Sequence, residues 1–142
     1  MTQNSTTPGQ MMEMFTYSIA CNKGISEVAS KMAGACEQFK FALLHTYNYH
    51  EILEGKGFPI ERKVFIYEIC QAKMASKILT TNPEFSIFMP CKIVIYEHEG
   101  SSVVSTMNME MMLKIFEENK EMYNETMQLF GTLKELMTSL TI

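Results

Sequence analysis

Short segments rich in β-branched, aromatic and other apolar residues recur along the chain, several of them with polar residues at alternate positions. Such segments are typical of β-strands. They lie at residues 14–20, 41–47, 64–70, 91–97 and 102–107. Glu99-Gly100 separates the last two segments, and a tight turn at this point predicts a β-hairpin.

Other segments carry apolar residues every three or four positions, which is the spacing of an amphipathic helix. This pattern predicts helices over residues 25–36 and 71–80, a short helical segment at 50–56, and a long helical run that Asn108 can cap. Asn82-Pro83 ends the second helix. The C-terminal run is long, so we expect a break near Asn119 or Gly131.

Helices that alternate with strands, together with one hairpin, predict an α+β fold. We expect a mixed, mainly antiparallel sheet with the helices packed on one face. The 142 residues suffice for one domain with a sizeable core. Residues 1–13 are interpreted as a flexible N-terminal arm, because the start is polar and contains Pro8 and Gly9, and residues 14–142 as the single domain.

Acidic residues outnumber basic ones, sixteen Asp and Glu against twelve Lys and Arg, which gives a formal net charge of −4. A nucleic-acid partner is therefore not expected, because phosphate contacts require a basic surface. The chain has no secretory-signal pattern and no run of about 18 apolar residues, so we expect no membrane partner and a cytoplasmic location. Four cysteines without a CxxC pair are interpreted as free thiols.

A series of short motifs follows the third predicted strand in a fixed order: Glu68-Ile69-Cys70, Ala75 with Ile78-Leu79, Asn82-Pro83-Glu84, Phe88-Met89-Pro90-Cys91 and Val94-Ile95-Tyr96-Glu97. This order resembles the family called domain of unknown function 302 (DUF302), and the Pro-Cys motif is its most specific part. Upstream, Lys40 stands where the family often has glycine. The resemblance covers about residues 14–138 and implies a fold similar to the TATA-binding-protein-like group, a homodimer and no settled activity. That fold name implies no DNA binding, because function depends on sites rather than folds.

Cys70 closes a predicted strand and immediately precedes a helix, a position at which the helix dipole can lower the pKa of a thiol. Cys91 opens the next strand after Pro90. The favoured interpretation is that both are small packing residues, and the alternatives are a redox or ligand-binding thiol and a metal site. If the two strands ran parallel, the cysteines would lie at opposite ends of them and a direct disulfide would not be expected.

Glu68 shares a predicted strand face with Cys70, and Glu97 shares one with Cys91. Glu68 is the stronger candidate for a functional carboxylate, since Glu97 lies beside a turn. His45 and His98 are further candidate ligands that, with Cys70 or Cys91, would complete a metal site. Nothing in the sequence gathers these residues at metal-ligand spacing, so isolated polar roles are favoured.

The chain has fourteen methionines, with one cluster at residues 107–112 and another at 11–14. Methionine can bind Cu(I), but it more often fills irregular cores and adaptable interfaces. No phosphate loop, nucleophile elbow, HExxH motif or dinucleotide fingerprint is present, which disfavours a familiar type of enzyme. We therefore expect a non-enzymatic module that binds a small ligand or a partner, with a thiol redox or metal-binding protein as the alternative. The cofactor, if any, is not specified by the sequence.

Overall fold

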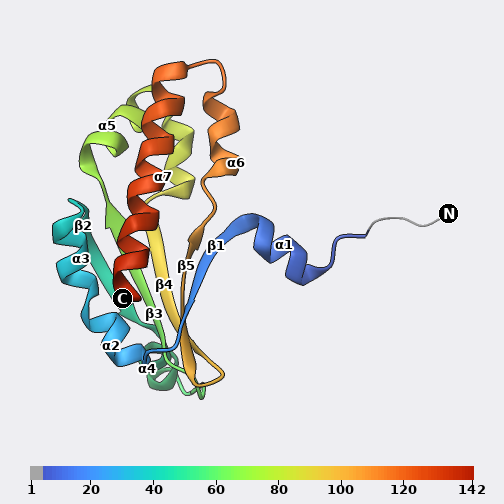
Figure 1. The fold of residues 1–142 in the computed structure, drawn as a ribbon, viewed down its shortest axis with the longest axis vertical. Helices are drawn as coiled ribbons and strands as arrows, with labels where there is room; N and C mark the ends of the chain where they lie inside the picture. The colour runs from blue at the N-terminus through green and yellow to red at the C-terminus, as the bar shows by residue number, and fades with distance from the viewer. Residues whose placement is uncertain (1–4) are drawn as a thin grey trace.

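The structure is a computed structural model that describes residues 5–142. Its centre is a five-stranded sheet in the order β1-β5-β4-β3-β2 (Figure 1), and every neighbouring pair of these strands is antiparallel. The strands are β1 (Thr16–Cys21), β2 (Ala42–Asn48), β3 (Val64–Cys70), β4 (Cys91–His98) and β5 (Ser101–Met107). The predicted α+β class is confirmed, and the fourth and fifth strands form the predicted hairpin. The sheet was expected to be mixed, but the five strands among residues 5–142 pair only in antiparallel fashion.

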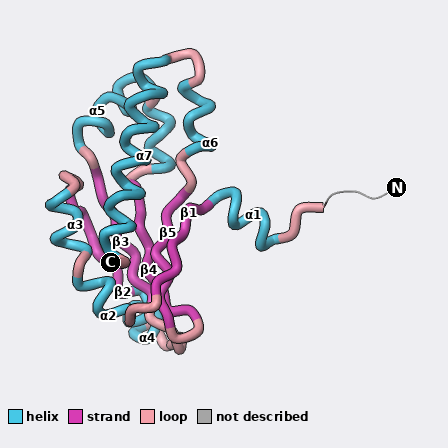
Figure 2. The backbone as a smooth tube through the Cα atoms, in the orientation of Figure 1, coloured by secondary structure: helices cyan, strands magenta, loops and turns pink. Residues whose placement is uncertain are grey.

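The helices gather mainly on one side of the sheet and at one end of it (Figure 2). They are α1 (Pro8–Phe15), α2 (Ile25–Ser30), α3 (Met32–Gln38), α4 (Tyr49–Gly55), α5 (Ala72–Thr81), α6 (Glu110–Leu113) and α7 (Lys120–Leu140), with 3₁₀ turns η1 (Pro83–Phe88) and η2 (Lys114–Phe116). Helices α2, α3 and α7 lie on the same side of the sheet (Figure 1). Within the described part of the chain, no helix combines the length and the apolar character that crossing a bilayer requires.

Side-chain caps explain where two of the helices begin. The Asn119 side chain accepts a hydrogen bond of 3.2 Å from the backbone N–H of Met122, so the predicted break falls at Asn119 and Gly131 lies inside α7. Thr7 and Gln10 form a capping box around Pro8, and residues 8–15 are therefore helical within and just beyond the segment interpreted as an arm. Residues 1–4 of that segment lie outside the described part of the chain.

The main core lies between the sheet and helices α2, α3 and α7. Val28, Ile93, Val104 and Leu136 are completely buried in it. Cys36 is also part of this core, at 2% exposure, as its place on a helical apolar stripe predicts. Burial also raises the pKa of the Cys36 thiol.

A second, smaller apolar cluster lies beyond the end of the sheet, where α5, η1, η2 and the first turns of α7 meet. Its buried members are Met74, Ile78, Phe85, Phe116 and Met122. The rings of Phe85 and Phe116 stack with centroids 5.0 Å apart and an interplanar angle of 22°. This cluster positions the candidate site described below.

The buried Tyr67 of β3 makes stability sensitive to alkaline pH. Burial, and secondarily the neighbouring Cys36, raise the pKa of Tyr67 to about 12. A pKa raised by folding stabilises the protein fully below the unfolded value of about 10, and this contribution disappears as pH rises through the folded value. We expect the unfolding free energy of the wild type to fall by about 2–3 kcal/mol between pH 10 and 12 because of this residue. Urea unfolding of wild type and Tyr67→Phe across this range measures it. If the unfolding free energies of the two proteins changed in parallel with pH, the expectation would be contradicted.

Candidate functional site

The antiparallel pairing of β3 with β4 brings the two candidate cysteines to the same end of the sheet. β3 ends at Cys70, β4 begins at Cys91, and Ile69 is the residue opposite Cys91. The parallel arrangement considered from the sequence, which would have separated the two thiols, is not formed. Both cysteines are free and half-buried.

Cys70 and Cys91 both line an apolar pocket of about 380 Å³. The pocket lies where the main core meets the second cluster, since Ile69 belongs to the first and Phe85 to the second. No charged residue from the described part of the chain lines it. The wall is built from many elements of the fold: strands β2, β3 and β4, helices α5, α6 and α7, the turns η1 and η2, and the segments that join them. Its apolar side chains include Phe41, Leu44, Met74, Ala75, Ile78, Phe85, Phe88, Met89, Met109, Met112, Phe116 and Leu129.

Very few polar side chains reach this pocket. Gln71 is already engaged, because its side chain accepts a 2.7 Å hydrogen bond from the backbone N–H of Met74 and caps α5. Thr126 of α7 is 1% exposed, and its hydroxyl has no hydrogen-bond partner among residues 5–142. An unpaired buried hydroxyl is costly, and Thr126 is one of the residues that line the cavity.

Of the two thiols in the pocket wall, that of Cys91 lies in an environment that disfavours its ionisation. Burial, and secondarily the nearby Cys70, raise the pKa of the Cys91 thiol. Cys91 is therefore a poor thiolate at neutral pH. The start of α5, next to Cys70, is capped by the Gln71 side chain.

His45 and Glu68 come together, but on the opposite face of the sheet from the core. They are neighbours in the β2–β3 register. Glu68 accepts a 2.7 Å hydrogen bond from the hydroxyl of Tyr47, whose ring lies 4.3 Å from that of His45. This hydrogen bond is the main cause of a raised pKa for Tyr47, with burial and the Glu68 charge adding to it. Neither His45 nor Glu68 lines the apolar pocket.

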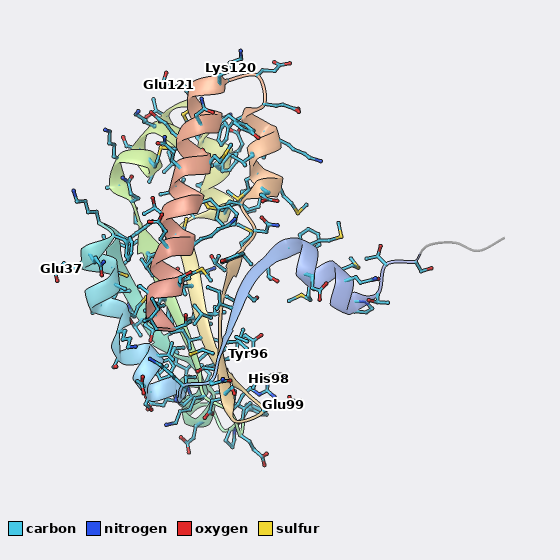
Figure 3. All side chains as sticks on the ribbon, in the orientation of Figure 1. Glu37, Tyr96, His98, Glu99, Lys120 and Glu121 are labelled. Carbon is cyan, nitrogen blue, oxygen red and sulfur yellow. The ribbon has the colours of Figure 1, made fainter. Side chains whose placement is uncertain are left out.

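His98 is too distant to join Cys91 in a metal site. It lies seven residues further along β4, about 23 Å away for an extended strand. Figure 3 shows His98 near Glu99 at the end of the sheet remote from the second cluster. Glu97, on the same strand, accepts a 2.6 Å hydrogen bond from the backbone N–H of Lys63 and so has a structural partner. Among residues 5–142, no group of three or more His, Cys, Asp or Glu side chains is placed to hold a metal ion.

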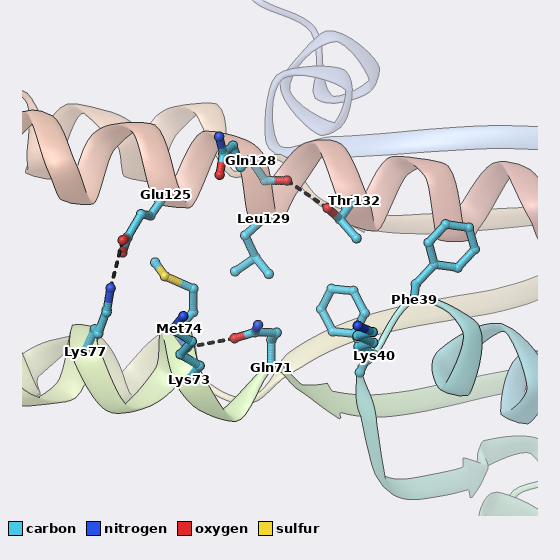
Figure 4. Close-up of a pocket in the computed structure, with 11 residues that line it drawn as sticks. Phe39, Lys40, Gln71, Lys73, Met74, Lys77, Glu125, Gln128, Leu129 and Thr132 are labelled. Carbon is cyan, nitrogen blue, oxygen red and sulfur yellow. Dashed lines mark hydrogen bonds and ion pairs between the residues drawn. The ribbon is translucent and has the colours of Figure 1, made fainter.

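A second cavity, of about 370 Å³, lies beside the apolar pocket between α5 and α7 (Figure 4). Unlike the pocket, it is lined by charged residues: Lys40, Lys73, Lys77 and Glu125. We call it the lysine cleft. Lys77 donates a 2.7 Å hydrogen bond to Glu125, while Lys40 and Lys73 make no ion pair within the described part of the chain.

Sequence reasoning identified two pocket residues, Cys70 and Cys91, and missed most of the others. The methionine cluster at residues 107–112 was the one further signal, since Met109 and Met112 both line the pocket. Thr126 and the lysine cleft had no such signal, because their significance depends on α7 packing beside α5.

The family model described as "Domain of unknown function DUF302" matches residues 17–140. The chain belongs to the DUF302 family. This DUF302 domain is also similar to the crystal structure of an uncharacterized conserved DUF302 protein from Bacillus stearothermophilus, with a TM-score of 0.78 and 21% identity. The similarity covers 91% of this chain and 99% of the other, and it shows a shared fold. No curated protein matches the sequence.

Proposed function

We propose that this DUF302 domain binds a small, mainly apolar ligand without chemically transforming it. The observation that supports this function is the pocket of about 380 Å³ with no charged residue in the wall that the structure describes. Ligand pockets are commonly 300–1,000 Å³, mostly apolar, with a small number of polar groups that orient the ligand. Polar residues are few in this wall: Gln71, Ser86 and Thr126.

A series of 1-alkanols tests the proposal, because each offers an apolar chain of chosen length to the pocket. We expect the affinity for the native protein to rise about fourfold per methylene, from 1-butanol upwards, until the pocket is full. Isothermal titration calorimetry gives each dissociation constant. An absence of saturable binding, or affinity that does not depend on chain length, would contradict a ligand-binding pocket.

The alternative function is thiol chemistry or soft-metal binding at Cys70 and Cys91. Its support is that both thiols line one cavity. The raised pKa of Cys91 predicts that this thiol reacts slowly with iodoacetamide at pH 7 and faster as pH rises above 9. Peptide mass spectrometry on the native protein measures each cysteine. Rapid labelling of Cys91 or Cys70 at pH 7, faster than free cysteine, would favour the thiol function.

Free thiols also suit a reducing compartment, and we propose a cytoplasmic location.

We further propose that the protein forms a homodimer through the sheet face that points away from α7. Ile66, Val94 and Tyr96 lie on this face and are half-buried in the single chain. Figure 3 shows Tyr96 on that side. Helix α1 projects outward (Figure 1), buries none of its residues and leaves Met11, Met12, Met14 and Phe15 exposed. Two uncovered apolar surfaces on one chain favour association with a second copy.

Sedimentation equilibrium tests the homodimer. We expect twice the chain mass of 16.3 kDa for the wild type and a single chain mass for Val94→Lys, because a lysine in the middle of the face would be buried without a partner. Unchanged far-UV circular dichroism would show that the variant remains folded. A monomeric wild type at millimolar concentration would contradict the proposal.

A further inference from the structure

The apolar pocket and the lysine cleft are neighbouring cavities with part of their walls in common. Phe41, Gln71, Met74 and Leu129 line both of them. Figure 4 shows Met74 on α5 and Leu129 on α7 facing one another across the space between the two helices. Both side chains are flexible, and methionine in particular adapts its shape to what it contacts. A ligand held in the pocket is thus separated from the cleft by the side chains of these shared residues.

The lysine cleft is positively charged in a protein that is negatively charged overall. Three lysines and one glutamate line it, and the chain has a net charge of −4. Lys77 donates a 2.7 Å hydrogen bond to one carboxylate oxygen of Glu125, while the other oxygen is buried without a partner among residues 5–142. Glu121 is a further, more distant partner of that lysine at 4.0 Å. This leaves the charges of Lys40 and Lys73 without an ion-pair partner among residues 5–142.

The end of α3 fixes the backbone conformation at Lys40 and so the place of this side chain in the cleft wall. Its φ angle is +63°, in the left-handed region that non-glycine residues rarely adopt. Glycine would relieve this strain, yet the chain has lysine at this turn between α3 and β2. Lys40 follows the last turn of α3, where the backbone N–H of Phe41 donates a 2.8 Å hydrogen bond to the carbonyl of Cys36, so its left-handed conformation is that of a common helix C-terminal cap.

We infer that the ligand of this domain is an amphipathic anion, with its apolar chain in the pocket and its anionic group in the lysine cleft near Lys40 and Lys73. The inference rests on the proposed function, because it specifies the class of ligand that the apolar pocket takes. The alkyl chain reaches the cleft when the flexible side chains of Met74 and Leu129 move apart. A carboxylate head group accepts charge-assisted hydrogen bonds from the two lysines, whose ammonium groups are otherwise unpaired.

Octanoate and 1-octanol form the decisive pair of probes, because they share the alkyl chain and differ in the charged group. Calorimetric titrations compare wild type with Lys73→Gln, Lys40→Gly and the control Lys56→Gln, which removes an exposed lysine of the segment after α4. We expect the first two variants to bind octanoate about five- to tenfold more weakly than wild type and 1-octanol equally well. Lys56→Gln should bind both probes as wild type does. Lys40→Gly should be at least as thermally stable as wild type, so its loss of octanoate affinity would not result from unfolding.

The outcomes separate this inference from the proposed function. Suppose that 1-octanol binds, but that octanoate binds equally well to wild type, Lys73→Gln and Lys40→Gly. The assignment of an anionic head group to the cleft is then wrong, and the proposed binding of apolar ligands in the pocket is retained. If 1-octanol and octanoate both fail to bind the wild type, the proposed function fails, and the inference fails with it. Weaker octanoate binding in Lys56→Gln as well would show a general effect of net charge and would also overturn the assignment to the cleft.

Discussion

Replacing Ala75 by phenylalanine is expected to abolish the binding of 1-octanol to the apolar pocket. Ala75 lies on α5, is half-buried and is part of the pocket wall. A ring at this position occupies the volume that the alkyl chain needs, so we expect the dissociation constant to rise about tenfold or more. Ala72→Phe is the matched control, because Ala72 is exposed on the same helix and does not line the pocket.

The comparison of the two variants is informative because the substitutions are chemically identical. Calorimetric titration with 1-octanol should show weak or no binding for Ala75→Phe and wild-type binding for Ala72→Phe. Thermal unfolding of both variants shows whether each remains folded. Unchanged affinity in a folded Ala75→Phe protein would place the binding site elsewhere.

Replacing Phe85 by alanine is expected to cost about 3–5 kcal/mol of unfolding free energy. Phe85 is 1% exposed, stacks on Phe116 and is a central member of the second cluster. Its removal leaves a cavity next to the pocket, and the loss of apolar burial adds to the loss of ring contact. Phe88→Ala is the matched control: this ring also contacts Phe85, at 5.5 Å, but is 42% exposed. We expect it to cost less than half as much.

Urea unfolding of wild type and both variants measures these free energies. Equal, small losses for Phe85→Ala and Phe88→Ala would show that the second cluster contributes little to stability. The pocket would then not be held by a rigid wall on the η1 side.

The strands were the most predictable part of the fold. β3 was predicted to its observed bounds, Val64–Cys70, because strand-forming residues run without interruption and a helix signal follows at once. A break near Asn119 or Gly131 was also predicted, and α7 begins at the first of these, where Asn119 caps it. By contrast, the predicted helix over 25–36 is divided at Lys31, and η1 was not predicted because residues 83–88 show no regular apolar spacing.

The candidate site was less predictable, because it depends on which elements become neighbours. Local pattern does not determine whether β3 and β4 run parallel or antiparallel, and this choice decides whether Cys70 and Cys91 lie near one another. The pocket combines Phe41, Cys91 and Thr126, which lie far apart in the sequence. Nothing in the sequence distinguishes Thr126 from other helical residues, because its burial and its unpaired hydroxyl depend on the tertiary structure.

The central claim is that a ligand occupies the apolar pocket, and methionine methyl NMR tests it most directly. With ¹³C-methyl methionine in the native protein, each of the fourteen methionines reports on its own surroundings during a titration with 1-octanol. We predict saturable shifts for the methionines that line the pocket: Met74, Met89, Met109 and Met112. The exposed Met12 and Met127 should not shift. Shifts confined to Met11, Met12 and Met14 on α1, or no saturable shift at all, would contradict the account.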